Sequence, residues 1–140
     1  MAGKDAVLTL RKTGEAPGSA DGSCMHTLYY DMMAGGTRAG TCELRPEETW
    51  AARLSGQVAY TVFPEHRGHH YALEALRLLC VEAKKRGLEK LTVTCRPGNA
   101  ASRRILELAG AELETVETVP PEHPLHRSGV REVCVYHIRI

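Results

Sequence analysis

The spacing of apolar residues changes abruptly between residues 57 and 86, and this change limits the folds open to the chain. Residues 57–63 are rich in Val, Tyr, Thr and Phe, which favours a β-strand, and Pro64 ends that strand. From Tyr71 to Arg86 the apolar residues recur at helical spacing, basic residues occupy the last turn, and Gly87 follows as a stop signal. The sequence therefore predicts a strand, a short loop and a helix in direct succession.

Further strands and helices are predicted on both sides of this unit. The strands cover residues 6–12, 27–33, 37–44, 91–95, 112–119 and 133–140, and a second helix covers residues 100–109. Gly35-Gly36 is predicted as a hairpin turn, residues 15–23 as a loop, and residues 45–56 as a loop or a short helix capped near Glu47. The order strand, helix, strand, helix over residues 57–109 predicts a right-handed crossover with parallel pairing.

Length and charge exclude several classes of function. A chain of 140 residues is expected to form one domain over residues 1–140. Its formal net charge of +1 provides no broad field for nucleic acid or an anionic membrane, and no apolar run is long enough for a membrane span or a signal peptide. The five cysteines lack any C-x-x-C spacing, which argues against a disulfide framework or a zinc site. We therefore expect a cytoplasmic protein with no nucleic-acid or membrane partner.

The loop between the strand and the helix has the composition of a phosphate-binding turn. A diphosphate at the start of a helix needs several backbone N–H groups that point into one small volume, together with the positive end of the helix dipole. Residues 67–72 lie where that geometry arises, and Gly68 and Ala72 are small enough to let phosphate oxygens approach the main chain. Arg67 could add a charge-assisted contact, or could lie on the surface.

Two signatures in this region resemble those of the GNAT acetyltransferase superfamily. The family's cofactor motif, R/Q-x-x-G-x-G/A, is matched by Arg67, His70 and Ala72. The family's next signature is an Asn after the following strand and a helix that ends in a leucine-glycine-aromatic turn, and here Asn99 and Gly110 match it. The resemblance covers residues 57–111. It implies an α/β fold of the α+β type, with a mixed, centrally splayed β-sheet flanked by helices.

By this resemblance the chain binds acetyl-coenzyme A (acetyl-CoA). Main-chain groups of residues 62–64 would pair with the pantetheine arm, and unpaired N–H groups where two parallel strands splay apart would bind the thioester oxygen. Asn99 would orient the pantetheine or a bound water, or would serve as a plain helix N-cap. The implied cofactor-binding residues are Val62, Phe63, Pro64, Arg67, Gly68, His69, His70, Tyr71, Ala72, Asn99 and Ser102.

The chain departs from the family pattern at two positions. His70 stands where the family most often has glycine, so its backbone is expected to avoid conformations that only glycine tolerates. If His69 or His70 is protonated, it would add positive charge to the loop; otherwise one is exposed and the other packs on the neighbouring loop. Leu106 stands where many relatives place a tyrosine that protonates the leaving thiolate. Because a thiol has a pKa of about 8.5, water could supply that proton instead.

The general base is left open by the sequence. An attacking ammonium must lose a proton before it is nucleophilic, and a carboxylate or imidazole normally takes that proton directly or through water. The candidates are Glu43, Glu65, His26 and Tyr60. Strand positions are held more rigidly than loop positions, which favours Glu43 and Tyr60. Together with Asn99, these two are the predicted catalytic residues.

The three histidines of the loop, His66, His69 and His70, raise the question of a metal ion. No carboxylate or cysteine lies at a recognisable spacing that would complete a tetrahedral set with them. We therefore expect no metal site.

Few residues are available to form the acceptor site. Relatives commonly insert two helices between the first and second strands, whereas this chain has only residues 13–25 there. The acceptor site is therefore open, or is completed by residues 45–56, by residues 120–131 or by a second subunit of a homodimer. His123, His126 and Arg127 could meet an anionic acceptor, although a solvated surface loop is the more economical description.

The resemblance to the GNAT superfamily implies an acyl-CoA-dependent N-acyltransferase that transfers acetyl from acetyl-CoA to a small-molecule or peptide amine. The amine would attack the thioester directly within a ternary complex, since none of the five cysteines is placed as an evident nucleophile. The alternative is a non-catalytic module on the same fold that binds coenzyme A or another protein. His70, Leu106 and the short acceptor region favour this alternative.

Overall fold

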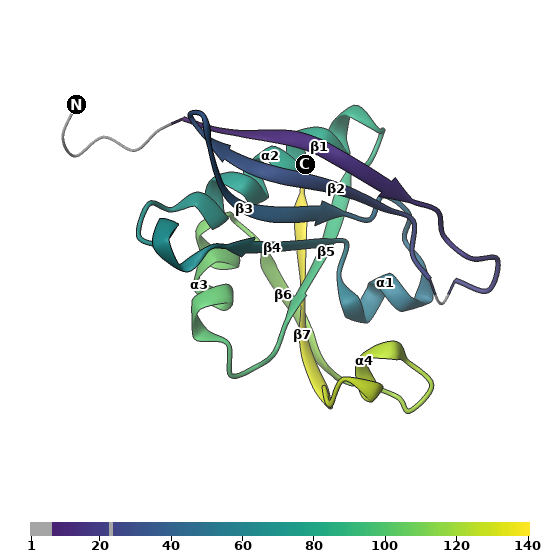
Figure 1. Ribbon diagram of the computed structural model, residues 1–140. Helices are drawn as coiled ribbons and strands as arrows, with labels where there is room; N and C mark the ends of the chain where they lie inside the picture. The colour runs from purple at the N-terminus through teal and green to yellow at the C-terminus, as the bar shows by residue number, and fades with distance from the viewer. Residues whose placement is uncertain (1–6, 23) are drawn as a thin grey trace.

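Two antiparallel sheets meet at an angle in the computed structural model, which describes residues 7–22 and 24–140 (Figure 1). Sheet A has the strand order β1-β2-β3-β4, and sheet B has the order β5-β7-β6. The strands of sheet A are β1 (Leu8–Ala16), β2 (Thr27–Ala34), β3 (Thr37–Leu44) and β4 (Val58–Val62). The strands of sheet B are β5 (Lys90–Cys95), β6 (Glu112–Thr118) and β7 (Glu132–Arg139).

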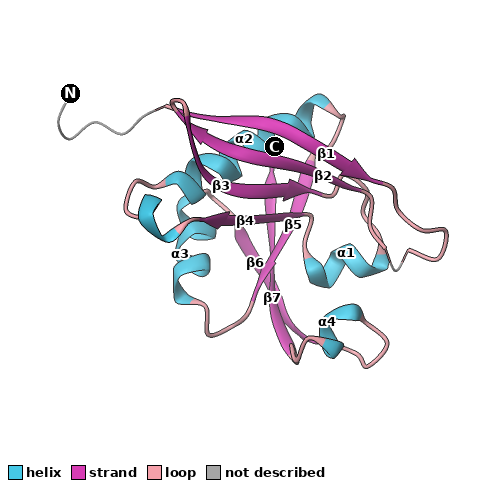
Figure 2. Ribbon diagram, in the orientation of Figure 1, coloured by secondary structure: helices cyan, strands magenta, loops and turns pink. Residues whose placement is uncertain are grey.

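The helices lie in the connections between these strands (Figure 2). They are α1 (Trp50–Ser55), the 3-10 turn η1 (Pro64–His66), α2 (Tyr71–Lys85), α3 (Ala100–Leu108) and α4 (Pro124–Arg127). Among the described residues, no helix is both long enough and apolar enough to cross a membrane.

The predicted fold class is confirmed, while several boundaries differ from the predicted ones. β1 continues to Ala16, so the predicted loop begins later than residue 15, and Ala6 lies outside the described residues. Residues 45–56 do contain a helix, and the residue that caps it is Thr49 rather than Glu47, because the Thr49 hydroxyl accepts a hydrogen bond from the Ala52 N–H at 3.1 Å.

The main hydrophobic core lies between α2, the inner face of sheet A and one face of sheet B. α2 buries the helical stripe that the sequence predicts, and it contacts β1, β3 and β4. Fully buried members of this core include Leu28, Met32, Leu44, Leu76, Leu79, Leu91 and Leu106. A smaller cluster joins α1 and the segment around α4 to the other face of sheet B, and its members are Leu54, Val119, Val130, Val133 and Val135. Both faces of sheet B are therefore covered near β7.

β4 and β5 meet at one point and otherwise belong to different sheets. The Gln57 N–H donates to the Thr92 carbonyl at 2.7 Å, and the Thr92 N–H donates to Gln57 Oε1 at 2.8 Å. The predicted parallel pairing of these strands is wrong beyond this contact, because among the described strands β4 pairs with β3 alone and β5 pairs with β7 alone.

Candidate functional site

A cavity of about 530 Å³ opens beside β4, where the two sheets have separated. Four parts of the chain line it: β4, the loop that follows it, the first turn of α2, and one face of α3. The lining residues are Tyr60, Thr61, Val62, His66, Arg67, Gly68, His70, Tyr71, Ala72, Leu73, Ala101, Ile105 and Leu108. Strand, loop and helix are thus brought together around one space.

The first turn of α2 presents free backbone donors to this cavity. The first hydrogen bond within the helix runs from the Glu74 N–H to the His70 carbonyl at 3.1 Å, so the N–H groups of Tyr71, Ala72 and Leu73 have no acceptor inside the helix. No side chain of the preceding residue caps them. All three residues line the cavity. A diphosphate placed there would accept these donors and would also lie at the positive end of the helix dipole.

His70 has a left-handed backbone at the start of α2. Its φ of 60° and ψ of 24° make it the only residue other than glycine with a positive φ among those described. Glycine favours this region and histidine occupies it at some cost, so the position suits the glycine that the family motif has there. Its neighbour Gly68 also has a positive φ, of 91°. The imidazole of His69 stacks on the Tyr71 ring with the ring centroids 5.2 Å apart, and His69 itself is not one of the residues that line the cavity.

The hydrogen bonds of β4 alternate, and this alternation aims two of its N–H groups away from β3. The Phe63 N–H donates to the Ala39 carbonyl at 2.9 Å, and Val62 lies opposite Gly40 without a shift in register. In an antiparallel ladder, every second residue of a strand is hydrogen-bonded to its partner strand, so the residues of β4 that bond β3 alternate with residues that do not. The N–H groups of Tyr60 and Val62 therefore point away from β3, toward the side of β5. These are the strand donors that a ligand in the cavity can reach.

Tyr60 crosses from β4 toward α3. Burial raises the pKa of its phenol, a hydrogen bond with Ser102 acts in the opposite direction, and the nearby Cys95 raises the pKa further. The phenol is therefore protonated at neutral pH and can donate a hydrogen bond. Ser102 itself does not line the cavity, so its contact with the site runs through Tyr60.

Asn99 caps α3, as its plain structural role requires. Its Oδ1 accepts a hydrogen bond from the Ser102 N–H at 3.1 Å, and it does not line the cavity. Leu106, at the position of the tyrosine in many relatives, is fully buried in the main core. α3 therefore offers the cavity only the apolar side chains of Ala101, Ile105 and Leu108.

Glu43 lies on the other face of sheet A from Tyr60. It stands opposite Ala59, whereas Tyr60 stands opposite Cys42, and consecutive residues of a strand point to opposite faces. Its carboxylate accepts a hydrogen bond from Arg45 Nη2 at 2.8 Å. The two side chains that the sequence favours for catalysis are therefore not brought together.

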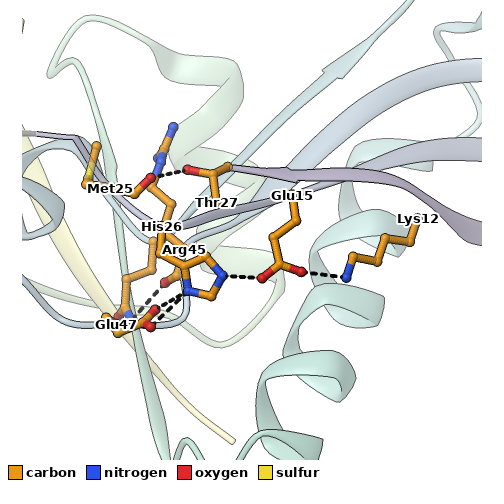
Figure 3. Close-up of polar contacts among 8 residues, drawn as sticks. Lys12, Glu15, Met25, His26, Thr27, Arg45 and Glu47 are labelled. Carbon is orange, nitrogen blue, oxygen red and sulfur yellow. Dashed lines mark hydrogen bonds and ion pairs between the residues drawn. The ribbon is translucent and has the colours of Figure 1, made fainter. Parts of the chain in front are cut away.

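His26 does not line the cavity and instead forms a polar cluster with Glu15 and Glu47 (Figure 3). Its Nε2 lies 2.6 Å from Glu15 Oε2, and its Nδ1 lies 2.8 Å from Glu47 Oε2. Hydrogen bonds to Glu15 and then to Glu47 raise the pKa of the imidazole above its ordinary value. Lys12 and then His26 lower the pKa of Glu15 to about 2. Both ring nitrogens are engaged, so His26 is not poised to accept a proton at the cavity.

His123 corrects the description of residues 120–131 as a solvated loop. It is only 1% exposed, its Nε2 lies 2.8 Å from the Ala51 carbonyl, and its Nδ1 accepts from the Leu125 N–H at 3.1 Å. Its ring also packs against the Trp50 ring in a T-shaped arrangement, with the ring centroids 5.5 Å apart. The residue is a structural link between α1 and α4, and sequence periodicity could not reveal it because Ala51 lies 72 residues away along the chain.

His66, His69 and His70, in the loop before α2, do not form a metal-binding group. In the described parts of the chain, no three His, Cys, Asp or Glu side chains lie close enough together to hold a metal ion.

Several cavity residues were not predicted from the sequence. Thr61, His66 and Leu73 are neighbours of predicted positions, whereas Ala101, Ile105 and Leu108 come from α3. The three α3 residues follow one another at spacings of four and three, which places them on one helical face. This helical spacing is the sequence pattern that could have identified them as one face of α3.

Comparison with known families now identifies this arrangement. The family model described as "Acetyltransferase (GNAT) domain" matches residues 10–112, more than half of the chain. The chain belongs to the GNAT acetyltransferase family. No curated protein matches the chain.

Solved structures agree with the GNAT assignment at the level of fold. The IAA acetyltransferase from Bacillus cereus ATCC 14579 is 14% identical, with a TM-score of 0.69, and the match covers 96% of this chain and 100% of that one. The microcin C7 self immunity acetyltransferase MccE, solved with acetyl-CoA and AMP, is 18% identical with a TM-score of 0.62, covering 81% of this chain and 61% of that one. YncA from Salmonella typhimurium, solved with its cofactor acetyl-CoA, is 16% identical with a TM-score of 0.60, covering 81% and 64% respectively.

This GNAT chain is shorter than many of the acetyltransferases that it resembles. It spans 58–61% of the length of several of those structures. At identities of 14–23% the likeness establishes the shared fold alone.

Proposed function

We propose that this chain transfers an acetyl group from acetyl-CoA to a primary amine, by direct attack of the amine on the thioester in a ternary complex. The observation that carries the proposal is the first turn of α2, whose three free N–H groups line a cavity continuous with β4. This is the donor arrangement that a diphosphate requires, and a diphosphate is the part of acetyl-CoA that a helix N-terminus recognises.

The loop supports the same ligand by its charge and its small side chains. Arg67 lines the cavity and can form a charge-assisted contact with a phosphate oxygen. A Cβ atom at Gly68 would have nothing within 4 Å, so the main chain there is open to close approach. His70 also lines the cavity, which makes its imidazole a candidate for a second contact.

In the proposed complex, β4 holds the pantetheine arm and the thioester. The N–H groups of Tyr60 and Val62 face away from β3, so they are the donors that would pair with the arm and stabilise the oxyanion of the tetrahedral intermediate. The other two predicted strand contacts, Phe63 and Pro64, are less suited, because the Phe63 N–H already bonds Ala39 and Pro64 has no N–H.

Tyr60 is assigned to the leaving group rather than to the attacking amine. A phenol whose pKa is raised by burial keeps its proton, so it can donate a hydrogen bond to the departing sulfur but cannot take a proton from an ammonium. Because the thiol has a lower pKa than the phenol, we expect Tyr60 to stabilise the thiolate by hydrogen bonding and water to deliver the proton. Ser102 would position the phenol, and Asn99 would hold Ser102 by capping α3.

Glu43 is the proposed general base, acting through water from the face of sheet A that Thr61 shares. Thr61 lines the cavity, and Thr61 and Glu43 project from the same face because Thr61 pairs with Thr41 and Ala59 pairs with Glu43. The ion pair with Arg45 would keep the carboxylate fixed in place.

A non-catalytic module that binds coenzyme A is the second candidate, and one observation favours it. None of the described residues that line the cavity carries a carboxylate, and Glu43 is paired with Arg45. Such a module would bind the ligand through the same α2 donors without turning it over.

Two experiments separate these possibilities. A thermal-shift titration with acetyl-CoA tests the shared premise, and both candidates require an increase in melting temperature. Release of free thiol from acetyl-CoA in the presence of polyamines, amino sugars, amino acids or peptide N-termini then tests transfer. Thiol release that depends on one of these amines supports the enzyme, whereas stabilisation without release across the whole panel supports the binding module.

A further inference from the structure

Two cysteines stand directly opposite each other in sheet B. Cys95 is the last residue of β5, and the register of the β5–β7 ladder, which has no shift, places it against Cys134. Neighbouring residues of one face point the same way, so both thiols project into the main core, where Cys134 is a buried member and Cys95 packs against it. In the ladders formed by the described strands, no other two cysteines face each other.

The alternation of hydrogen-bonded pairs along the β5–β7 ladder gives the distance between the Cα atoms of Cys95 and Cys134. The Ile140 N–H donates to the Glu89 carbonyl at 3.0 Å, and the Cys95–Cys134 pair lies six positions further along both strands. Hydrogen-bonded pairs recur at every second position, so Cys95 and Cys134 form such a pair, with a Cα separation of about 5.5 Å. This Cα separation falls within the range of roughly 4.4–6.8 Å found in disulfides, and the two thiols are hydrogen-bonded to each other. The Cβ atoms of a hydrogen-bonded pair lie near the upper end of about 4.5–5.5 Å, so they must approach to about 3.5–4.5 Å when the bond forms.

The surroundings of the two thiols differ. Cys134 is fully buried, whereas Cys95 is partly exposed, so an external reagent reaches Cys95 first. Burial raises the pKa of Cys95 to about 11, with smaller contributions in the same direction from Cys134, while the positive charge of Arg103 acts to lower it. The Arg103 side chain is fixed nearby, since its Nε donates to the Tyr136 hydroxyl at 3.1 Å and its Nη1 donates to the Pro97 carbonyl at 3.3 Å.

We propose that Cys95 and Cys134 are a redox-active pair that closes to an intramolecular disulfide on reaction with a small-molecule disulfide of the glutathione type. The Cys95 thiolate attacks one sulfur of the reagent, which forms a mixed disulfide and expels one thiol. The Cys134 thiolate then attacks the Cys95 sulfur, closes the cross-strand bond and expels the second thiol. The two cysteines lose two electrons and two protons in total, and the reagent gains both as two thiols.

The position of the pair connects it with the cavity. Cys95 is close enough to Tyr60 to affect the pKa of the phenol, and it is followed by the turn that carries Asn99. The remaining cysteines are placed differently: Cys24 is exposed in a loop, Cys42 is buried opposite Tyr60, and Cys80 lies in α2. Closure of this pair does not require acetyltransferase activity.

The test uses the full chain with Cys24→Ser, which removes the exposed thiol that would otherwise form adducts. After incubation with glutathione disulfide, intact mass spectrometry is expected to show the loss of two hydrogen atoms, and peptide mapping is expected to join the peptides of Cys95 and Cys134. Dithiothreitol should reverse both changes. Since only the thiolate reacts, the rate should rise about tenfold for each pH unit between about pH 7 and 9.

Two further variants on the same background sharpen the result. Cys134→Ser should stop at a glutathione adduct on Cys95, and Cys80→Ser should form the disulfide as the parent does. The proposal is overturned if peptide mapping of the parent finds Cys95 and Cys134 as free thiols after this treatment, or finds either one joined to a different cysteine. If Cys134→Ser does not fold, the peptide maps of the parent and of Cys80→Ser decide the matter.

Discussion

The Gln57 side chain and the Thr92 backbone are joined by a buried hydrogen bond where the residue before β4 meets β5. Gln57 Oε1 accepts from the Thr92 N–H at 2.8 Å, and the Gln57 N–H donates to the Thr92 carbonyl at 2.7 Å. Gln57 is 2% exposed. The two sheets separate beyond this link, so it sets where the cavity begins.

Replacement of Gln57 by methionine keeps the side-chain volume but removes the acceptor for the Thr92 N–H. An unsatisfied buried donor costs about 1–3 kcal/mol, so the free energy of unfolding should fall by roughly that amount. Urea denaturation of wild type and variant measures it. A loss below about 0.5 kcal/mol would show that the link carries no stability, because ordinary surface substitutions fall within that range.

His70 should be replaced by glycine and, as a matched control, by alanine. Glycine relieves the left-handed backbone, so His70→Gly should raise the free energy of unfolding by about 0.5–1 kcal/mol, whereas His70→Ala keeps the strain and should not. Both variants lose the imidazole. If the ring adds positive charge to the loop, both should bind acetyl-CoA more weakly by calorimetry, and unchanged affinity in both would eliminate that role.

Much of this loop and of its two helices could be predicted from sequence because the signals are local. The stripe of α2, the stop at Gly87 and the cap at Asn99 each depend on residues within one or two turns, and the structure confirms them. The burial of His123 against Ala51, the pairing of Cys95 with Cys134 and the single contact of β4 with β5 depend on residues far apart in the chain. No periodicity within a segment specifies such contacts, and they decide the shape of the cavity.

Tyr60→Phe should lower kcat for amine acetylation by about 10–100-fold, the equivalent of one hydrogen bond made in the transition state, and should leave the affinity for acetyl-CoA within about twofold. Steady-state thiol release and calorimetry measure the two quantities. Tyr30→Phe, which removes the hydroxyl of a buried tyrosine of β2 that does not line the cavity, is the control and should change neither. An unchanged kcat in Tyr60→Phe would remove Tyr60 from the mechanism.

The His26 cluster should make stability depend on pH (Figure 3). Because the pKa of folded His26 is raised above its ordinary value of 6.5, the stabilisation is full below pH 6.5 and is lost as pH rises through the raised value. His26→Gln should therefore lower the melting temperature most at acidic pH, near 6 and below, and least at alkaline pH. A difference between the two proteins that stays constant from about pH 5.5 to 9 would contradict this interpretation.

Isothermal titration calorimetry with acetyl-CoA tests the central claim, that the first turn of α2 and the loop before it hold the diphosphate. Wild type should bind with one site per chain, and Arg67→Gln should bind about tenfold more weakly because it loses a charge-assisted contact. Arg104→Gln, which removes the same charge from an exposed position of α3, should bind as wild type does. Absence of binding to wild type at millimolar acetyl-CoA, or equal affinity in Arg67→Gln and wild type, would contradict the account.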